Sequence, residues 1–173
     1  MKNIIFFISL LMLISCGSNP LSTSKKEFIK CPTVLFAAEH KTYLSINANS
    51  ISVDDVAYKA EINNYNFSRG CFINDNNFSA SLSILFIVKP LIKEQNIITL
   101  PFYLAILDKE KKVRDIQYYY TEGSFNKNWE SETKEFIETD LSKTISVKIL
   151  DVDEMMTIIV GFMLDKKQLE ILN

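Results

Sequence analysis

Apolar and polar residues alternate with a period of two along most of the chain beyond residue 31, which is typical of β-strands. In the segment 58–67 the apolar residues first occupy even positions, up to Ile62, and then odd positions, Tyr65 and Phe67. This phase inversion after Ile62 indicates a β-bulge. Asn74–Asn77 predicts a hairpin turn, because Asn and Asp tolerate left-handed backbone. Beyond this turn, serines separate a row of apolar residues that predicts a strand with one buried face: Ala80, Leu82, Ile84, Phe86 and Val88.

Shorter apolar runs predict further strands around this pair. Pro101 stands near the start of one run, where the missing N–H is tolerated at a strand start or a sheet edge. The charged run 108–112 predicts a solvated turn. Asp165 and Gln168 have the spacing of a capping box and predict a short C-terminal helix. The additional strands are expected at 33–37, 42–46, 98–107, 113–122, 133–141, 144–150 and 157–164.

Many short strands with no helices between them predict an all-β fold. We expect an immunoglobulin-like antiparallel β-sandwich of seven or eight strands, with a short C-terminal helix, in one domain over residues 31–173. A lipocalin-like barrel is the alternative, although a Gly-x-Trp near the first strand and a large apolar interior are missing. A chain of 173 residues that is 47% hydrophobic is large enough to bury a core.

The N-terminus reads as an export signal. Lys2 precedes an apolar run over 4–14, which is shorter than the roughly 20 residues that a membrane-spanning helix needs. The run ends in Leu13-Ile14-Ser15-Cys16, which resembles the bacterial lipobox. The resemblance implies a signal peptide over 1–15 and a lipid on Cys16, which becomes the mature N-terminus. An ordinary signal peptide with an incidental Cys16, or an uncleaved anchor, is the alternative.

Residues 16–30 are rich in turn and coil formers and predict a lipidated flexible tether, with an undetected first strand as the alternative. Two acyl chains hold a protein stably on a membrane. We therefore expect a protein of the bacterial cell envelope that is lipid-anchored and faces the periplasm. Gly17 stands where an Asp favours the inner membrane, so the sequence leans toward the outer membrane without deciding between the two.

Two cysteines remain once Cys16 is lipidated. An even pair in an exported chain suggests a disulfide between Cys31 and Cys71, which would close a loop of about 40 residues. Two buried free thiols are one alternative. The other is a catalytic thiol with His40 as its base.

The composition gives little support to an enzyme or a nucleic-acid binder. A formal net charge of −2 gives no sign of the positively charged surface that binds nucleic acid. His40, the single histidine, is interpreted as part of an exposed turn. Asp54–Asp55 and Asp151–Glu154 carry carboxylates that suit calcium, but they lack the spacing and glycine of an EF-hand loop, so solvated turns are expected. We expect no catalytic residue, no metal and no cofactor.

Three patches of the sequence are similar to small bacterial lipoproteins of alphaproteobacterial type. The resemblance covers most of residues 31–173, but only in these patches, and it implies no activity and no catalytic residue. The patches are Cys31-Pro32-Thr33-Val34, Pro101-Phe102-Tyr103-Leu104-Ala105, and Val160-Gly161-Phe162 with Leu164 and Gln168-Leu169-Glu170.

Three consecutive tyrosines suggest how the protein works. Strand alternation either buries Tyr118 and Tyr120 and exposes Tyr119, or does the reverse, and sheet-core packing alone would also explain the three. An exposed aromatic residue can form a binding platform, so Tyr119 is the candidate partner surface. We predict a lipid-anchored binding or scaffolding module whose partner is an envelope protein or peptide. A carrier of a hydrophobic ligand is the alternative, and a hydrolase with a scattered site is a third class.

Overall fold

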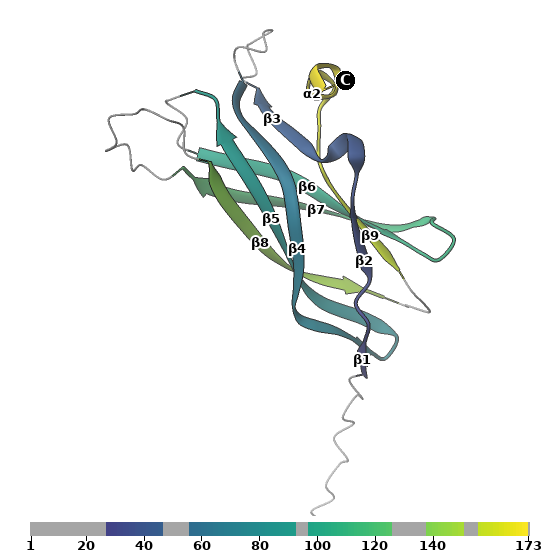
Figure 1. The fold of residues 1–173 in the computed structure, drawn as a ribbon. Coiled ribbons are helices and arrows are strands. Elements are labelled where there is room, and N and C mark those ends of the chain that lie inside the picture. The colour runs from purple at the N-terminus through teal and green to yellow at the C-terminus, as the bar shows by residue number, and fades with distance from the viewer. Residues whose placement is uncertain (1–26, 47–55, 93–96, 126–137, 151–155, 173) are drawn as a thin grey trace, which may run out of the picture.

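The computed structural model describes residues 27–46, 56–92, 97–125, 138–150 and 156–172, and it consists mainly of β-strands in two packed sheets (Figure 1). A 3-10 helix, η1, and one α-helix, α2, complete the described structure. The strands are β1 (Glu27–Ile29), β2 (Thr33–Phe36), β3 (Thr42–Ile46), β4 (Val56–Asn74), β5 (Asn77–Pro90), β6 (Ile97–Leu107), β7 (Val113–Ser124), β8 (Thr139–Ile149) and β9 (Thr157–Phe162), and the helices are η1 (Ala38–His40) and α2 (Lys166–Leu172).

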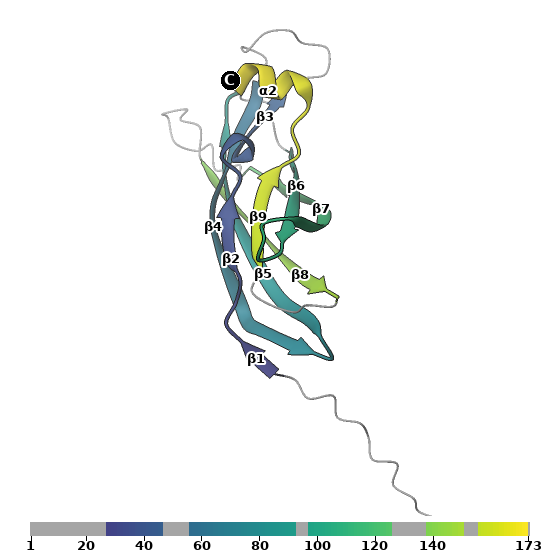
Figure 2. The ribbon, with the colours of Figure 1, turned by 90° about the vertical axis from the view of Figure 1, so that its right-hand side faces the viewer.

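The strands divide into two sheets. Sheet A has the order β1-β4-β5-β8, with β3 also paired to β4, and sheet B has the order β2-β9-β6-β7. Every pair is antiparallel except β2–β9. Figure 2 shows β6 and β7 on one side of the molecule and β4 on the other. The predicted all-β sandwich with a short C-terminal helix is confirmed, although the described residues form nine strands instead of seven or eight.

The strand order also has an immunoglobulin-like part. Strands β4-β5-β8 of sheet A and β7-β6-β9 of sheet B follow the order A-B-E and C′-C-F of that fold. The departure is β2, which pairs in parallel with β9 where an immunoglobulin domain has its last strand.

The longest hairpin joins β4 and β5, as the sequence predicted. Asp75 and Asn76 form its two-residue turn with φ of 49° and 61°, the left-handed conformation that Asp and Asn tolerate. The register shifts between Ile62 and Asn64, which confirms the bulge that the phase inversion predicted. A second shift falls between Phe67 and Cys71 and was not predicted. Gly70, with φ of 70°, supplies the left-handed residue there.

Two sequence predictions about element boundaries are wrong. The expected tether through residue 30 is wrong over Glu27–Ile29, because these residues pair with β4 as β1. The expected break between 141 and 144 is also wrong, since β8 pairs with β5 without interruption from Thr139 to Ile149. Residues 1–26 and 133–137, on which other parts of these predictions fall, lie outside the described residues.

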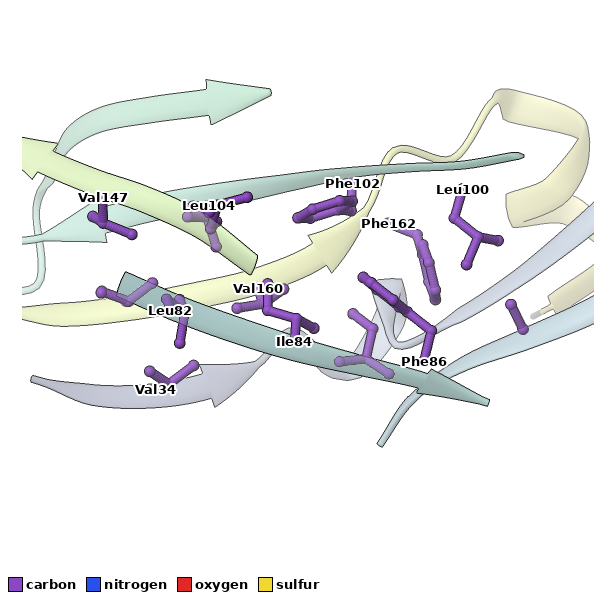
Figure 3. Packing of buried hydrophobic residues seen from close by; sticks show 14 of the residues in the cluster. Val34, Leu82, Ile84, Phe86, Leu100, Phe102, Leu104, Val147, Val160 and Phe162 are labelled. Carbon is purple, nitrogen blue, oxygen red and sulfur yellow. The ribbon is translucent and has the colours of Figure 1, made fainter. Parts of the chain in front are cut away.

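The core fills the space between the two sheets with large apolar side chains (Figure 3). Phe86 on β5 lies 5.2 Å from Phe102 on β6 and 5.6 Å from Phe162 on β9, measured between ring centroids. All three residues are fully buried. Because these rings come from strands of both sheets, they hold the two layers together.

One edge of β6 is completed by a side chain from the other sheet. Strand β9 ends at Phe162, opposite Phe102, so residues before Phe102 on β6 have no β9 partner. The carbonyl of Pro101 accepts a hydrogen bond from the N–H of Met163. Further along, the buried Tyr58 hydroxyl donates to the carbonyl of Thr99 (2.8 Å) and accepts from its N–H (2.9 Å). This arrangement explains why Pro101 is tolerated inside the strand: its nitrogen faces a position where no ladder bond is required.

Replacing Tyr58 by phenylalanine should lower the free energy of unfolding by about 1–3 kcal/mol, because the N–H and the carbonyl of Thr99 both lose their partner. The ring remains, so the loss isolates the hydroxyl. Urea unfolding followed by circular dichroism measures it. Tyr118→Phe is the matched control, since Tyr118 is 64% exposed and should change stability by less than about 0.5 kcal/mol. Equal stabilities of the two variants would contradict the role given to Tyr58.

The C-terminal helix begins with the capping box that the sequence predicted. Asp165 Oδ1 accepts from the N–H of Gln168 (2.7 Å), and Gln168 Oε1 accepts from the N–H of Asp165 (2.8 Å). The amide nitrogen of Gln168, which is only 5% exposed, donates to the carbonyl of Leu44 at 2.6 Å. Gln168 therefore both starts α2 and fastens it to β3.

Candidate functional site

The two outer faces of the sandwich differ in chemistry. The outer face of sheet A is mostly polar: Lys59 and Glu61 form an ion pair at 2.6 Å, and Ser83 is hydrogen-bonded to Thr144 across β5 and β8. Its apolar members are Leu85 and Ile87 on β5 and the ring pair of Phe28 and Phe72. The hydrogen bond and charge of Lys59 lower the pKa of Glu61 below its usual value. This face has the composition of an ordinary solvated surface.

The outer face of sheet B is apolar and aromatic. Strand register places Leu35, Ile159, Ala105 and Ile116 side by side in one row across all four strands. The next row contains Gly161, Tyr103 and Tyr118, and Pro101 pairs with Tyr120 beyond it. These residues contain no charged side chain, and together we call them the aromatic face: Leu35, Pro101, Tyr103, Ala105, Ile116, Tyr118, Tyr120, Ile159 and Gly161.

Much of the aromatic face is open to solvent. Tyr118 and Tyr120 are 64% and 63% exposed, Leu35 is 51% exposed and Ile116 is 42% exposed. Single exposed apolar residues are common on proteins, but a contiguous group of them marks an interaction surface. The tyrosines add hydroxyl groups to this surface, so it can both bury apolar area and form hydrogen bonds.

One end of the aromatic face is built around Gly161. A Cβ at this position would lie 2.7 Å from Tyr103 Cζ and 2.9 Å from His40 Cβ, so only glycine allows both side chains to pack here. His40 Nδ1 is 2.9 Å from the carbonyl oxygen of Phe162, and the His40 ring meets the Tyr103 ring edge-on. Burial raises the pKa of Tyr103. The expected exposed turn is present as η1, where Glu39 and the following Lys41 are exposed. The exposure expected of His40 itself is wrong, because its side chain is half-buried against Tyr103.

The expected exposure of Tyr119 is also wrong, and the reverse alternation holds. Tyr119 faces the inside of the sandwich, where its ring stacks on Phe102 with centroids 5.5 Å apart. Its hydroxyl donates to Gln117 Oε1 at 2.8 Å. Burial, and to a smaller extent the charge of Asp115, raises the pKa of Tyr119. The reason for the orientation is register: Tyr119 pairs with Phe102, which points into the core.

The expected disulfide between Cys31 and Cys71 is confirmed, with the two Cα atoms 5.1 Å apart. Cys31 lies between β1 of sheet A and β2 of sheet B, so the bridge fastens the chain where it passes from one sheet to the other. Because a bridged cysteine has no thiolate, the alternative of a catalytic thiol with His40 as its base is excluded in this state. Cys16 lies outside the described residues.

The acidic candidates for calcium binding, Asp54–Asp55 and Asp151–Glu154, lie outside the described residues. Among the residues that the structure does describe, no three His, Cys, Asp or Glu side chains gather as metal ligands would. Within the same ranges, none of the helices has the length and apolar character to cross a membrane.

Comparison of the chain with protein-family models, with curated proteins and with solved structures finds no match. The resemblance to small bacterial lipoproteins therefore stays a prediction from the sequence.

The aromatic face was not predicted from the sequence, although a signal for it was present. Strands β6 and β9 are nearly continuous apolar runs, which is typical of strands covered on both faces. In contrast, β5 alternates apolar residues with serine, as a strand with one solvated face does. Comparing these two patterns would have indicated that β6 and β9 carry a second apolar face.

Proposed function

We propose that the protein is a lipid-anchored binding module of the bacterial envelope, which contacts a protein partner through the aromatic face and performs no catalysis. The observation that carries this proposal is a contrast between the two outer faces. The middle of the outer face of sheet B, between Arg114 and Glu122, is aromatic and uncharged, whereas the outer face of sheet A is mostly polar. The partner surface thereby moves from Tyr119 to its neighbours Tyr118 and Tyr120.

The composition of the aromatic face supports a protein partner. The buried centres of protein–protein interfaces are depleted of charged residues and enriched in aromatic residues, with tyrosine prominent among them. Residues that contribute most to binding are often Tyr, Trp or Arg near the middle of the interface. Tyr118 lies between Ile116 and Tyr120 on β7, and its cross-strand partner is Tyr103.

The path of the chain fits attachment through a lipid on Cys16. The described chain begins at β1, at the end of the molecule opposite to α2 (Figures 1 and 2). A lipid anchor would hold the module by this end. The aromatic face runs along the side of the sandwich and would stay accessible to a neighbouring envelope protein.

The alternative of a hydrophobic-ligand carrier requires an apolar cavity between the sheets. The side chains that point inward from the two sheets contact one another instead, as Phe86 does with Phe102 and Phe162. We therefore place the function on the outer surface of the sandwich and not in its interior.

Replacing Tyr118 and Tyr120 together by alanine should weaken partner binding about tenfold or more, because truncating central interface tyrosines typically costs about 1–2 kcal/mol or more. A photo-crosslinking amino acid at position 118 identifies the partner in cells, and the affinity of that partner is then measured with purified proteins. Ser79→Ala with Ser81→Ala on the polar face is the matched control and should leave the affinity unchanged. Equal affinities for both pairs of substitutions would contradict the proposal.

Replacing Cys16 by serine should abolish lipid attachment, because the thioether requires a thiol at this position. Labelled palmitate should enter the wild-type protein and be absent from the variant, which is expected to be unprocessed or released from the membrane. Ser18→Ala, two positions beyond the lipidation site, is the control and should be labelled normally. Equal labelling of the Cys16 variant would contradict the lipobox interpretation.

A further inference from the structure

Strand β7 is an open edge of sheet B within the described residues, because the strand order ends there. The hydrogen bonds of β6 determine which residues of β7 point their backbone N–H and carbonyl groups away from β6. The Pro101 carbonyl and both backbone groups of Thr99 point toward the β9 side, so the even-numbered residues of β6 bond to β7. The pairing of Phe102 with Tyr119 then turns Tyr119 toward β6. It follows that Ile116, Tyr118 and Tyr120 present their N–H and carbonyl groups to the open edge.

This edge lacks the features that usually protect an edge strand. Natural proteins protect edges by short strands, charged residues, proline, β-bulges or covering groups. At the opposite edge of sheet B, β2 has only four residues. At the edge of sheet A, the carbonyl of Lys148 on β8 accepts a hydrogen bond from Gln117 Nε2 at 3.2 Å. Strand β7 has 12 residues. Its register shift lies near the start, between Val113 and Asp115, and its regular centre, 116–121, contains neither charge nor proline.

We infer that two copies of the chain pair antiparallel along β7, about a twofold axis that passes beside Tyr118. The N–H and carbonyl groups that face the open edge belong to even-numbered residues of β7. In an antiparallel pair, each even-numbered residue must therefore lie opposite an even-numbered residue of the second copy. An axis at Tyr118 puts Ile116 opposite Tyr120. It also brings exposed Arg114, which lies at the register shift between Val113 and Asp115, next to exposed Glu122. Both are favourable cross-strand pairs, and twofold symmetry produces each of them twice.

No neighbouring register pairs opposite charges within β7. An axis at Gln117 would put Glu122 opposite Lys112, which precedes the strand. An axis at Tyr119 would place Ile116 opposite Glu122, and an axis at Tyr120 would place Tyr118 opposite Glu122. In the register about Tyr118, the three central pairs contribute about six backbone hydrogen bonds, two for each pair. The charge pattern of β7 thus identifies a second copy of this chain as the occupant of the edge, and it fixes the register.

Pairing along β7 joins two four-stranded sheets into one sheet of eight strands. The aromatic faces of the two copies then lie on the same side of the joined sheet, with Tyr118 and Tyr120 of each copy next to those of the other. This inference goes beyond the proposed function and does not depend on it, since the pairing uses the backbone edge of β7.

Sedimentation equilibrium of the full chain in density-matched detergent tests the pairing. Wild-type protein should show a reversible monomer–dimer equilibrium. Arg114→Glu should weaken the dimer about tenfold, because two attractive charge pairs become two repulsive ones. Combining Arg114→Glu with Glu122→Arg should restore the dimer to within about threefold of wild type. A protein that stays monomeric at all concentrations, or a double variant no tighter than Arg114→Glu, would overturn the inference.

Thiol crosslinking tests the register. In the inferred dimer the two Tyr118 positions are hydrogen-bonded partners with Cα atoms about 5.5 Å apart, so Tyr118→Cys should yield a covalent dimer with a short bis-maleimide. The two Tyr120 positions are offset by four residues, about 14 Å along the strands, and Tyr120→Cys should crosslink far less. Ser146→Cys on the polar face and the parent chain are controls. A dimer that crosslinks through position 120 or 146 in preference to 118 would overturn the register.

Discussion

Replacing Phe86 by alanine is expected to lower the free energy of unfolding by about 3–5 kcal/mol, the range typical of a large aromatic side chain lost from a core. Phe86 is fully buried on β5 and contacts rings from β6 and β9, so its removal opens a cavity between the two sheets. The partners cannot close this cavity without moving whole strands, because Phe102 and Phe162 are themselves fixed by strand pairing. Denaturant unfolding monitored by circular dichroism gives the change.

Phe28→Ala is the matched control for Phe86→Ala. Phe28 is 73% exposed on β1 and meets only the ring of Phe72 edge-on at 6.4 Å among the ring contacts of the described residues. Its truncation should therefore change stability by no more than about 1 kcal/mol. A cavity of this size should also bind a small apolar molecule such as benzene, as engineered apolar cavities do. If Phe86→Ala were no less stable than Phe28→Ala, the assignment of Phe86 to the junction between the sheets would be contradicted.

The sequence predicts the local structure of this protein well wherever a few neighbouring residues decide it. Asp75 and Asn76 take up the left-handed turn because of their own side chains, and Asp165 and Gln168 cap α2 by bonds within one helical turn. The phase inversion after Ile62 shows the bulge directly, since a bulge moves each later side chain to the other face. The bridge between Cys31 and Cys71 could be predicted because, once Cys16 is assigned to the lipid, these two are the cysteines that remain.

The sequence does not predict the features that depend on contacts between distant strands. Strand β1 consists of three residues without any alternation of its own, and it is a strand because β4 offers an open edge. The parallel pairing of β2 with β9 joins segments more than 120 residues apart. Neither arrangement leaves a local trace in the sequence.

The orientation of β7 shows why the candidate site in particular was missed. Ile116, Tyr118 and Tyr120 form the more apolar side of the strand, and a burial argument would turn this side toward the core. The structure instead points Gln117, Tyr119 and Thr121 inward, where Tyr119 stacks on Phe102. A strand that exposes its more apolar side contradicts the usual pattern of burial, and such contradictions are expected at surfaces that serve a function.

Replacing both Cys31 and Cys71 by serine is expected to lower the free energy of unfolding by about 4 kcal/mol, an effect as large as that of Phe86→Ala. The bridge spans a sequence separation of 40, and closing a loop of this length removes conformational entropy of that size from the unfolded chain. Measured losses for native disulfides fall in the range of about 2–5 kcal/mol. Both cysteines must be replaced, because a single substitution would leave the other thiol free to form mixed disulfides.

The mechanism of this destabilisation can be separated from its size. If the bridge acts on the unfolded chain, its removal lets that chain expand, and the dependence of the free energy of unfolding on denaturant should become steeper. Wild-type protein kept reduced should then match the double-serine variant in both midpoint and slope. A reduced wild-type protein that unfolds at the same denaturant concentration as the oxidised form would contradict this role. A lower midpoint with an unchanged slope would instead show that the bridge acts on the folded state, by holding the crossing from β1 to β2 against β4.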